Sequence, residues 1–258
     1  MTFKDLKKRV TLEAAQHRSR LSERLLNKPF WIWNIEQHKQ EDVRTNDDCC
    51  FNHIIRLPQR DGNDKPFYDY QQIIFESLVA QNGNKHLWIK KAIGLGISEF
   101  TLRFMTWLCL KDKALAGSQM CIVTGPRIDL AIALIYRMKR LFAGLVTFDT
   151  KEIVIELNAV KIEAFPSHHL DAMRGLPNVS FILLDEADFF PPGQQADARD
   201  VSERYNAKSN PYIAMVSTPN APEGLSERIE KESEDTVCIN VYSWITLMAS
   251  AKYTMQKK

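Results

Sequence analysis

From about residue 66 onward, short and almost wholly apolar segments alternate with longer segments of helical periodicity. The clearest apolar segments are 120–124, 180–185 and 211–217. A strand that is apolar on both faces has to be covered on both faces, as happens in a parallel sheet that is flanked by helices. This alternation predicts an α/β domain with a mostly parallel central sheet.

The individual elements follow from the same periodicities. The expected helices cover 70–79, 98–110 and 129–142. The expected strands cover 86–90, 120–124, 180–185, 211–217 and 236–242, and a hairpin is expected over 151–165 around Asn158. This domain is assigned to 63–258.

The first 62 residues differ in character and are predicted to form a small helical region. Residues 1–28 carry eight Lys and Arg against three Asp and Glu, with apolar side chains at spacings of three and four. The basic face of such a helix fits contact with phosphates or a membrane, but an ordinary solvated face is the favoured interpretation. The turn-rich segment 56–66 is the expected boundary.

Composition narrows the function classes. The 258 residues are 45% hydrophobic and 26% charged, with a net charge of +2, so charge alone predicts neither nucleic-acid nor membrane binding. No apolar run approaches the ~18 residues of a membrane span, and the N-terminus does not resemble a signal peptide. The five Cys include no C-x-x-C pair, and a reduced, cytoplasmic protein without membrane contact is expected.

The most informative phrase places Asp185 and Glu186 directly after the apolar run 181–184. The carboxyl ends of parallel strands are where such sheets build their sites. In nucleotide hydrolysis the first acid holds Mg²⁺, and the second orients and deprotonates the attacking water. A strand that ends in a solvated acidic turn has the same pattern.

A glycine-containing turn between a strand and a helix lies about ninety residues upstream, at 90–98. The phosphate loop of nucleotide hydrolases reads G-x-x-x-x-G-K-[ST], and its backbone N–H groups cradle phosphate oxygens. Here Gly94, Gly96 and Ser98 are present, but Ile97 stands at the usual lysine position. Lys91, at the other end of the loop, is the expected phosphate-binding ammonium. An ordinary structural turn is the alternative.

Two further motifs complete the series. Ser217 and Thr218 follow an apolar strand, where small hydroxyls can sense a γ-phosphate or cap a turn. Tyr70 and Gln71 precede the phosphate-loop strand; a Gln amide can pair with adenine and an adjacent ring can stack on it, although a helix start explains them as well. The order of the motifs favours a nucleotide site.

This order resembles the ATPase domain of the large terminase subunit, the motor that packages DNA into the capsids of tailed viruses. The resemblance covers roughly 66–245, with Tyr70-Gln71 as the adenine-reading motif, 91–98 as Walker A, Asp185-Glu186 as Walker B and Ser217-Thr218 as the coupling motif. Some terminases likewise carry the Walker A lysine at the start of the loop, as Lys91 does here.

The resemblance implies a P-loop NTPase fold of the ASCE, RecA-like type that hydrolyses ATP with Mg²⁺. Gly94, Gly96, Ile97 and the first N–H groups of the following helix are then expected to hold phosphates, and Ser98 and Asp185 to hold Mg²⁺. The catalytic pair is Lys91 and Glu186. The implied partners are double-stranded DNA, further copies in a homo-oligomeric ring, the capsid portal and the small terminase subunit.

Other functions stay open at this point. The metal-binding acids of the nuclease domain that usually follows in large terminases are not evident, so no DNA cutting is expected from these residues. A helicase-like, nucleic-acid-stimulated ATPase is one alternative. A pseudo-ATPase scaffold is another, because Ile97 departs from the Walker A pattern. His168-His169 is expected to be a loop pair rather than a metal site, and Arg127, Arg137 and Arg140 are candidate arginine fingers.

Overall fold

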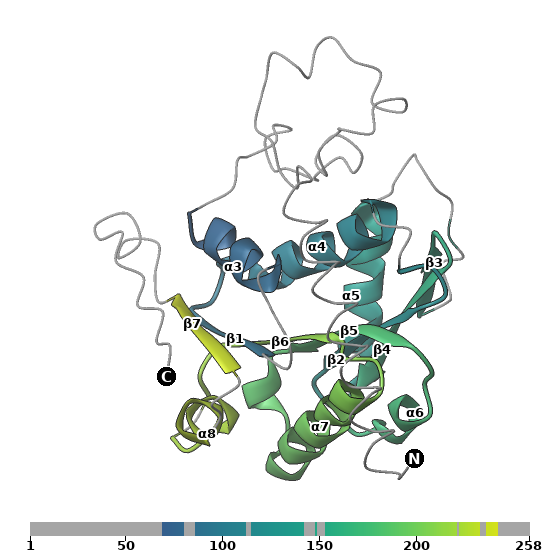
Figure 1. Ribbon diagram of the computed structural model, residues 1–258. Helices are drawn as coiled ribbons and strands as arrows, with labels where there is room; N and C mark the ends of the chain where they lie inside the picture. Colours follow the sequence, from purple (N-terminus) through teal and green to yellow (C-terminus); the bar gives the residue numbers. More distant parts are fainter. Residues whose placement is uncertain are drawn as a thin grey trace, which may run out of the picture.

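A seven-stranded sheet organises the described part of the computed structural model, which comprises residues 69–79, 86–111, 115–141, 148, 153–220, 222–232 and 236–241 (Figure 1). The predicted N-terminal region and its boundary segment lie outside these residues, so the domain division stays a prediction. The mostly parallel sheet flanked by helices is confirmed.

The strand order is β3-β4-β2-β5-β6-β1-β7. The strands are β1 (His86–Lys91), β2 (Gln119–Thr124), β3 (Val154–Leu157), β4 (Val160–Pro166), β5 (Val179–Asp185), β6 (Tyr212–Ser217) and β7 (Thr236–Val241). All neighbouring pairs are parallel except β3 with β4. The carboxyl ends of β1, β5 and β6 therefore lie at one edge, with β6 between the other two.

The predicted hairpin is this antiparallel pair. Asn158 and Ala159 connect its strands with φ values of 49° and 59°. Positive φ at both central residues is the requirement of the two-residue turn that matches the twist of a hairpin, and Asn tolerates it better than most residues.

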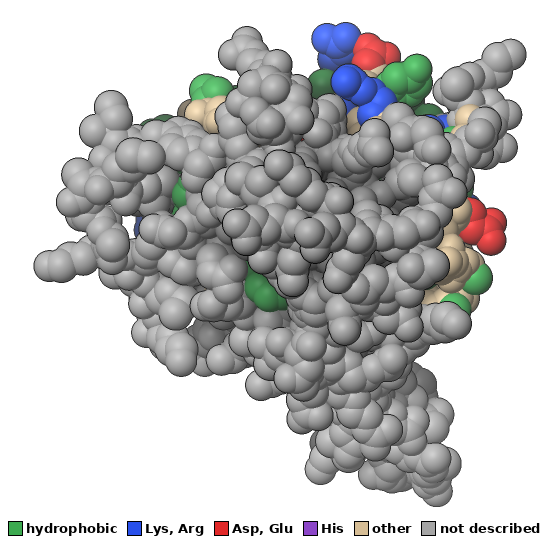
Figure 2. Space-filling view, turned by 90° about the horizontal axis from the view of Figure 1, so that it is seen from above, with side chains coloured by type: hydrophobic (Ala, Val, Ile, Leu, Met, Phe, Trp, Pro, Cys, Tyr) green, Lys and Arg blue, Asp and Glu red, His purple; other side chains and the backbone are tan. Residues whose placement is uncertain are grey.

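Helices cover both faces of the sheet. In Figure 1, α3 (Asp69–Val79), α4 (Ile97–Lys111) and α5 (Ile128–Leu141) lie above the sheet, and α6 (Asp171–Arg174), α7 (Pro192–Arg204) and α8 (Leu225–Glu232) lie below it. Each layer packs on its own buried apolar cluster. Two 3-10 helices, η3 (Ala187–Phe189) and η4 (Tyr205–Ala207), flank α7. Figure 2, seen from the α3–α5 side, shows described basic, acidic and apolar side chains next to one another at the rim.

The expected helices and single strands begin and end within a residue of the observed ones, and the expected hairpin begins three residues later than predicted. Helices α6, α7 and α8 and both 3-10 helices were not predicted. Helix α7 buries only a few side chains, among them Ala198 and Val201. Helix α8 buries little apolar surface besides Leu225 and Ile229. Helices with so few apolar residues give a weak periodic signal.

Candidate nucleotide-binding site

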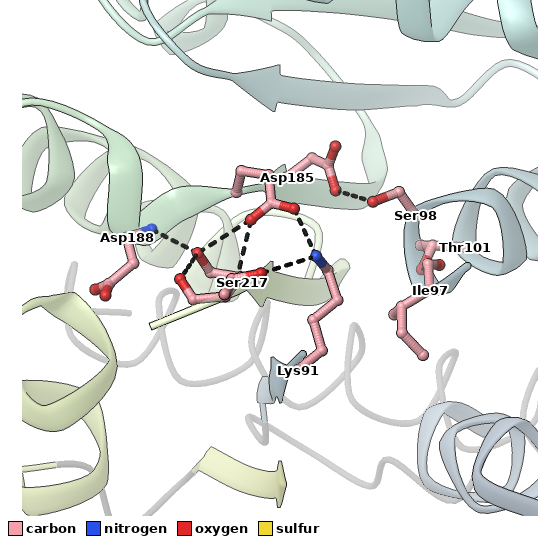
Figure 3. Close-up of polar contacts among 9 residues, drawn as sticks. Lys91, Ile97, Ser98, Thr101, Asp185, Asp188 and Ser217 are labelled. Carbon is pink, nitrogen blue, oxygen red and sulfur yellow. Dashed lines mark hydrogen bonds and ion pairs between the residues drawn. The ribbon is translucent and has the colours of Figure 1, made fainter. Parts of the chain in front are cut away.

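Three loops meet at the carboxyl edge of the sheet, directly after β1, β5 and β6. They bring together Lys91, Ser98, Asp185, Glu186, Ser217 and Thr218, most of the residues that the sequence singles out (Figure 3). Parallel sheets place their ligand sites at this edge.

The loop between β1 and α4 takes its shape from two glycines. Gly94 has φ of 83° and Gly96 has φ of 70°, backbone angles that residues with a side chain rarely adopt. An added Cβ at either position meets no atom within 4 Å, so the conformation and not the space requires glycine. Helix α4 begins at the next residue, and the Phe100 N–H donates to the Gly96 carbonyl at 2.9 Å. The first N–H groups of α4, which have no acceptor within their own helix, therefore emerge at this loop.

The burial of Ile97 explains why the loop tolerates an apolar residue at the usual lysine position. Its side chain is 1% exposed and belongs to the core beneath α3–α5. The predicted contact of Ile97 with a nucleotide is consequently restricted to its backbone N–H.

The two adjacent lysines at the end of β1 point to opposite faces, as successive strand residues do. Lys91 is 6% exposed; its Nζ lies 2.5 Å from Oε1 of Glu186 and donates to Oγ1 of Thr218 at 3.4 Å. Lys90 pairs instead with Glu230 of α8 at 3.2 Å. Of the two, Lys91 is therefore the lysine that contacts the Asp185-Glu186 pair, through Glu186.

Asp185 is a buried carboxylate at the end of β5. The Ser98 hydroxyl donates to its Oδ1 at 2.6 Å. Burial raises its pKa to about 6, and the neighbouring Glu186 adds to the increase, whereas the Ser98 hydrogen bond, Lys91 and Arg137 oppose it. Removal from water disfavours the charged form of an acid.

Glu186 leaves the strand in the left-handed region, with φ of 54° and ψ of 43°. That conformation costs a non-glycine residue ~1 kcal/mol or more. Its carboxylate compensates through contacts: Oε1 with Lys91, and Oε2 with the Thr218 N–H at 3.1 Å and the Ser217 hydroxyl at 3.5 Å. Ser217 at the end of β6 and Thr218 directly after it thus both contact Glu186.

Sequence reasoning missed Asp188, which is 2% exposed beneath the same edge. Its Oδ2 accepts from the Asn220 N–H at 2.7 Å and its Oδ1 from the Ser226 N–H at 3.1 Å, while its own N–H donates to Ser217. It connects η3 to β6, to the following loop and to the start of α8. The Asp-Glu-Ala-Asp run was the available signal.

Of the remaining predicted residues, Tyr70 contacts the glycine loop, whereas the candidate arginine fingers and the two histidines are paired elsewhere or exposed. Tyr70 is 2% exposed, and its hydroxyl donates to the Leu95 carbonyl of the glycine loop at 2.8 Å; Gln71 beside it is buried. Their contact with a base stays a prediction. Arg137 pairs with Glu99 at 2.9 Å and Arg127 with Asp129 at 2.7 Å. Arg140 and the two loop histidines are exposed.

Within the described residues, no group of three or more His, Cys, Asp or Glu is arranged to hold a metal ion. The relevant donor set is smaller: the adjacent oxygens of Ser98 and Asp185. Mg²⁺ prefers oxygen ligands and commonly uses one or two protein ligands together with substrate phosphates. Among the described helices, none is long and apolar enough to cross a membrane.

No family model and no curated protein matches the chain. Among solved structures, the large terminase ATPase domain of Thermus phage P74-26 aligns at a TM-score of 0.52 and 16% identity, over 72% of this chain and 84% of that domain. The HK97 bacteriophage large terminase aligns at 0.53 and 14% identity, over 73% of this chain and 41% of its own. The described chain therefore has the fold of a large terminase ATPase domain.

Proposed function

We propose that the protein is a Mg²⁺-dependent ATPase that acts as a motor on double-stranded DNA. The observation that carries this proposal is the meeting of Lys91, Ser98 and the Asp185-Glu186 pair beside a glycine loop that opens a helix. An ammonium, a hydroxyl, two carboxylates and free helix N–H groups are the parts that phosphoryl transfer requires.

In this proposal the loop and the first turn of α4 bind the phosphates. Backbone N–H groups at a helix N-terminus favour anions because of both their hydrogen bonds and the helix dipole. Lys91 adds the positive charge that Ile97 does not supply, and Gln71 reads the base.

Ser98 and Asp185 would hold Mg²⁺, because a hydroxyl and a carboxylate at 2.6 Å offer two adjacent hard oxygens. When bound, the ion neutralises charge on the phosphates. The raised pKa of Asp185 applies to the protein without the cation, whose charge would favour the ionised carboxylate.

Glu186 would position and deprotonate the attacking water. Its carboxylate pairs with Lys91, and a phosphate would be a competing partner for that ammonium. Nucleotide binding would thus release one carboxylate oxygen for the water while the Thr218 N–H retains the other. This exchange links the nucleotide to the loop after β6, the predicted coupling motif.

Four partners are proposed: double-stranded DNA, further copies of the chain in a ring, the capsid portal and the small terminase subunit. Their support is the shared fold and the motif order. A helicase-like ATPase and a pseudo-ATPase scaffold are the outcomes against which the proposal is tested.

The test compares Glu186→Gln with Glu230→Gln. Both substitutions remove the carboxylate partner of a lysine at the end of β1, but only Glu186 faces the phosphate loop. We expect Glu186→Gln to bind ATP near the wild-type level and to lower phosphate release by ~10²-fold or more, because the general base is lost. Glu230→Gln should hydrolyse like the wild type.

Equal turnover of Glu186→Gln and the wild type would contradict the assignment of the base. A folded wild type that binds ATP with Mg²⁺ but releases no phosphate, alone or with DNA, would favour the pseudo-ATPase scaffold.

A further inference from the structure

A buried hydrogen bond attaches the phosphate loop to helix α3. Tyr70 is the second residue of α3, and its hydroxyl donates to the Leu95 carbonyl at 2.8 Å. Both side chains are nearly inaccessible and belong to the same apolar cluster. Water does not compete efficiently for such a bond, and a carbonyl that loses its donor there stays unsatisfied.

Leu95 lies in the part of the loop where steric restrictions on the orientation of the peptide units are weakest. It stands between Gly94 and Gly96, both with positive φ. Glycine populates positive and negative φ about equally, so the peptide unit between Leu95 and Gly96 has little intrinsic preference for its present orientation.

The direction of the Leu95 carbonyl also determines the direction of the Gly96 N–H. In a planar trans peptide, the C=O of one residue and the N–H of the next point in opposite directions. Because Tyr70 holds the carbonyl toward the core, the Gly96 N–H points away from it. If the peptide flipped, a carbonyl oxygen would take the place of that N–H, and its partial negative charge would repel a phosphate.

We propose that Tyr70 is a positioning residue that keeps the Gly96 N–H of the phosphate loop in its anion-binding orientation. The inference rests on the proposed function and deepens it. Gln71, the proposed base-reading residue, is the next residue of α3. Helix α3 would thus serve both base and phosphate recognition. The Tyr70 hydroxyl would affect phosphate binding indirectly, through the Leu95–Gly96 peptide, and would not contact the base.

Tyr70→Phe tests this role, because it removes the hydroxyl and keeps the ring in the core. The two probes are ATP and tripolyphosphate, which carries the phosphates without a base, both measured by isothermal titration calorimetry. We expect the Kd of both probes to rise by the same factor, about 3- to 10-fold, as the loss of one buried hydrogen bond implies.

Tyr205→Phe is the matched control. Tyr205 is a buried tyrosine whose hydroxyl donates to the Met173 carbonyl, in the apolar cluster on the other face of the sheet. It should lower the thermal midpoint much as Tyr70→Phe does and leave both Kd values unchanged. Gln71→Ala should differ from Tyr70→Phe in one respect: its ATP affinity should fall, but its tripolyphosphate affinity should stay at the wild-type level.

Wild-type binding of tripolyphosphate by Tyr70→Phe, or equal weakening by Tyr205→Phe, would overturn the inference and leave the proposed function intact. A loss confined to ATP would return Tyr70 to base recognition. A folded wild type that binds neither probe would overturn the proposed function, and the inference with it.

Discussion

At the scale of single residues, the ionised form of Asp185 lowers the stability of the folded protein. The buried carboxyl has a pKa of about 6 compared with the ordinary 3.8, which corresponds to a cost of ~3 kcal/mol for keeping it ionised in the folded protein. Glu186 faces it with a like charge, whereas Lys91 and Arg137 oppose the increase in pKa. A carboxylate kept buried at such a cost, beside the Ser98 hydroxyl, is consistent with a role in holding a cation.

Asp185→Asn should therefore stabilise the metal-free protein at neutral pH. Well below pH 3.8 the wild-type carboxyl is protonated in both the folded and the unfolded state, so it contributes no penalty. As the pH rises from 3.8 to about 6, the unfolded state ionises and the folded state does not, so the wild type loses stability; above about pH 6 the loss is complete, at ~3 kcal/mol. The amide of the variant does not titrate. The difference in urea-unfolding free energy, measured with EDTA at about pH 3 and about pH 7.5, should thus be near zero at the lower pH and favour Asp185→Asn at the higher one.

The comparison at two pH values cancels the titration of groups that do not interact with position 185, because only that side chain differs between the two proteins. A variant that is less stable than the wild type at pH 7.5 would show that the ionised carboxylate is favoured in the folded state.

At the level of single residues, the sequence predicts which side chains gather but not how they are held. Strand alternation separates Lys90 from Lys91, and the loop pattern favours Lys91 for the site. Nothing local indicates that Glu186 adopts φ of 54°, because its partners are 31 to 95 residues away. Tyr70 is equally ambiguous: a tyrosine at a helix start fits stacking on a base and burial under a loop alike.

At the scale of elements, the segment around η3 is hydrogen-bonded to both the loop after β6 and the start of α8. Asp188 accepts from two backbone N–H groups, those of Asn220 and Ser226, and so fixes both the loop after β6 and the start of α8. These residues are 32 and 38 positions away in the chain, which is why a local pattern does not reveal the connection.

Asp188→Ala should consequently destabilise the protein by ~2–4 kcal/mol, because two backbone donors lose their acceptors inside the protein. Urea unfolding without nucleotide measures the loss. The control is Asp129→Ala, an exposed carboxylate paired with Arg127, which should change stability by less than ~1 kcal/mol. A loss below ~1 kcal/mol at position 188 would mean that water replaces the carboxylate and that the segment does not depend on it.

Predictability at the scale of elements follows apolar content. The core strands and α3–α5 were predicted closely because they bury continuous apolar faces. Helix α7 begins with proline as its first residue, a good helix start, but contains Gly193 and few apolar residues. Its placement depends on tertiary contacts, such as the amide of Gln195 donating to the carbonyls of Asp188 and Phe190.

For the molecule as a whole, the order of motifs along the chain predicted the fold better than any one motif did. Each motif alone is compatible with an ordinary turn. Their positions at the ends of β1, β5 and β6, which the sheet order brings side by side, make one site out of three segments. The fold does not identify the polymer on which the proposed motor acts, so the choice of polymer has to be measured.

We expect double-stranded DNA to stimulate ATP hydrolysis, and RNA at equal phosphate concentration to stimulate it less. The net charge of the chain is only +2, so the attraction to DNA has to come from local basic groups and should decline steeply with added salt. Phosphate release measured at several salt concentrations, with sedimentation of the same samples, tests both the stimulation and the ring. Glu186→Gln, which should bind DNA but hydrolyse ATP far more slowly, separates binding from turnover. RNA that stimulates as well as DNA would favour the helicase-like alternative, because a motor that packages duplex DNA has to distinguish the two.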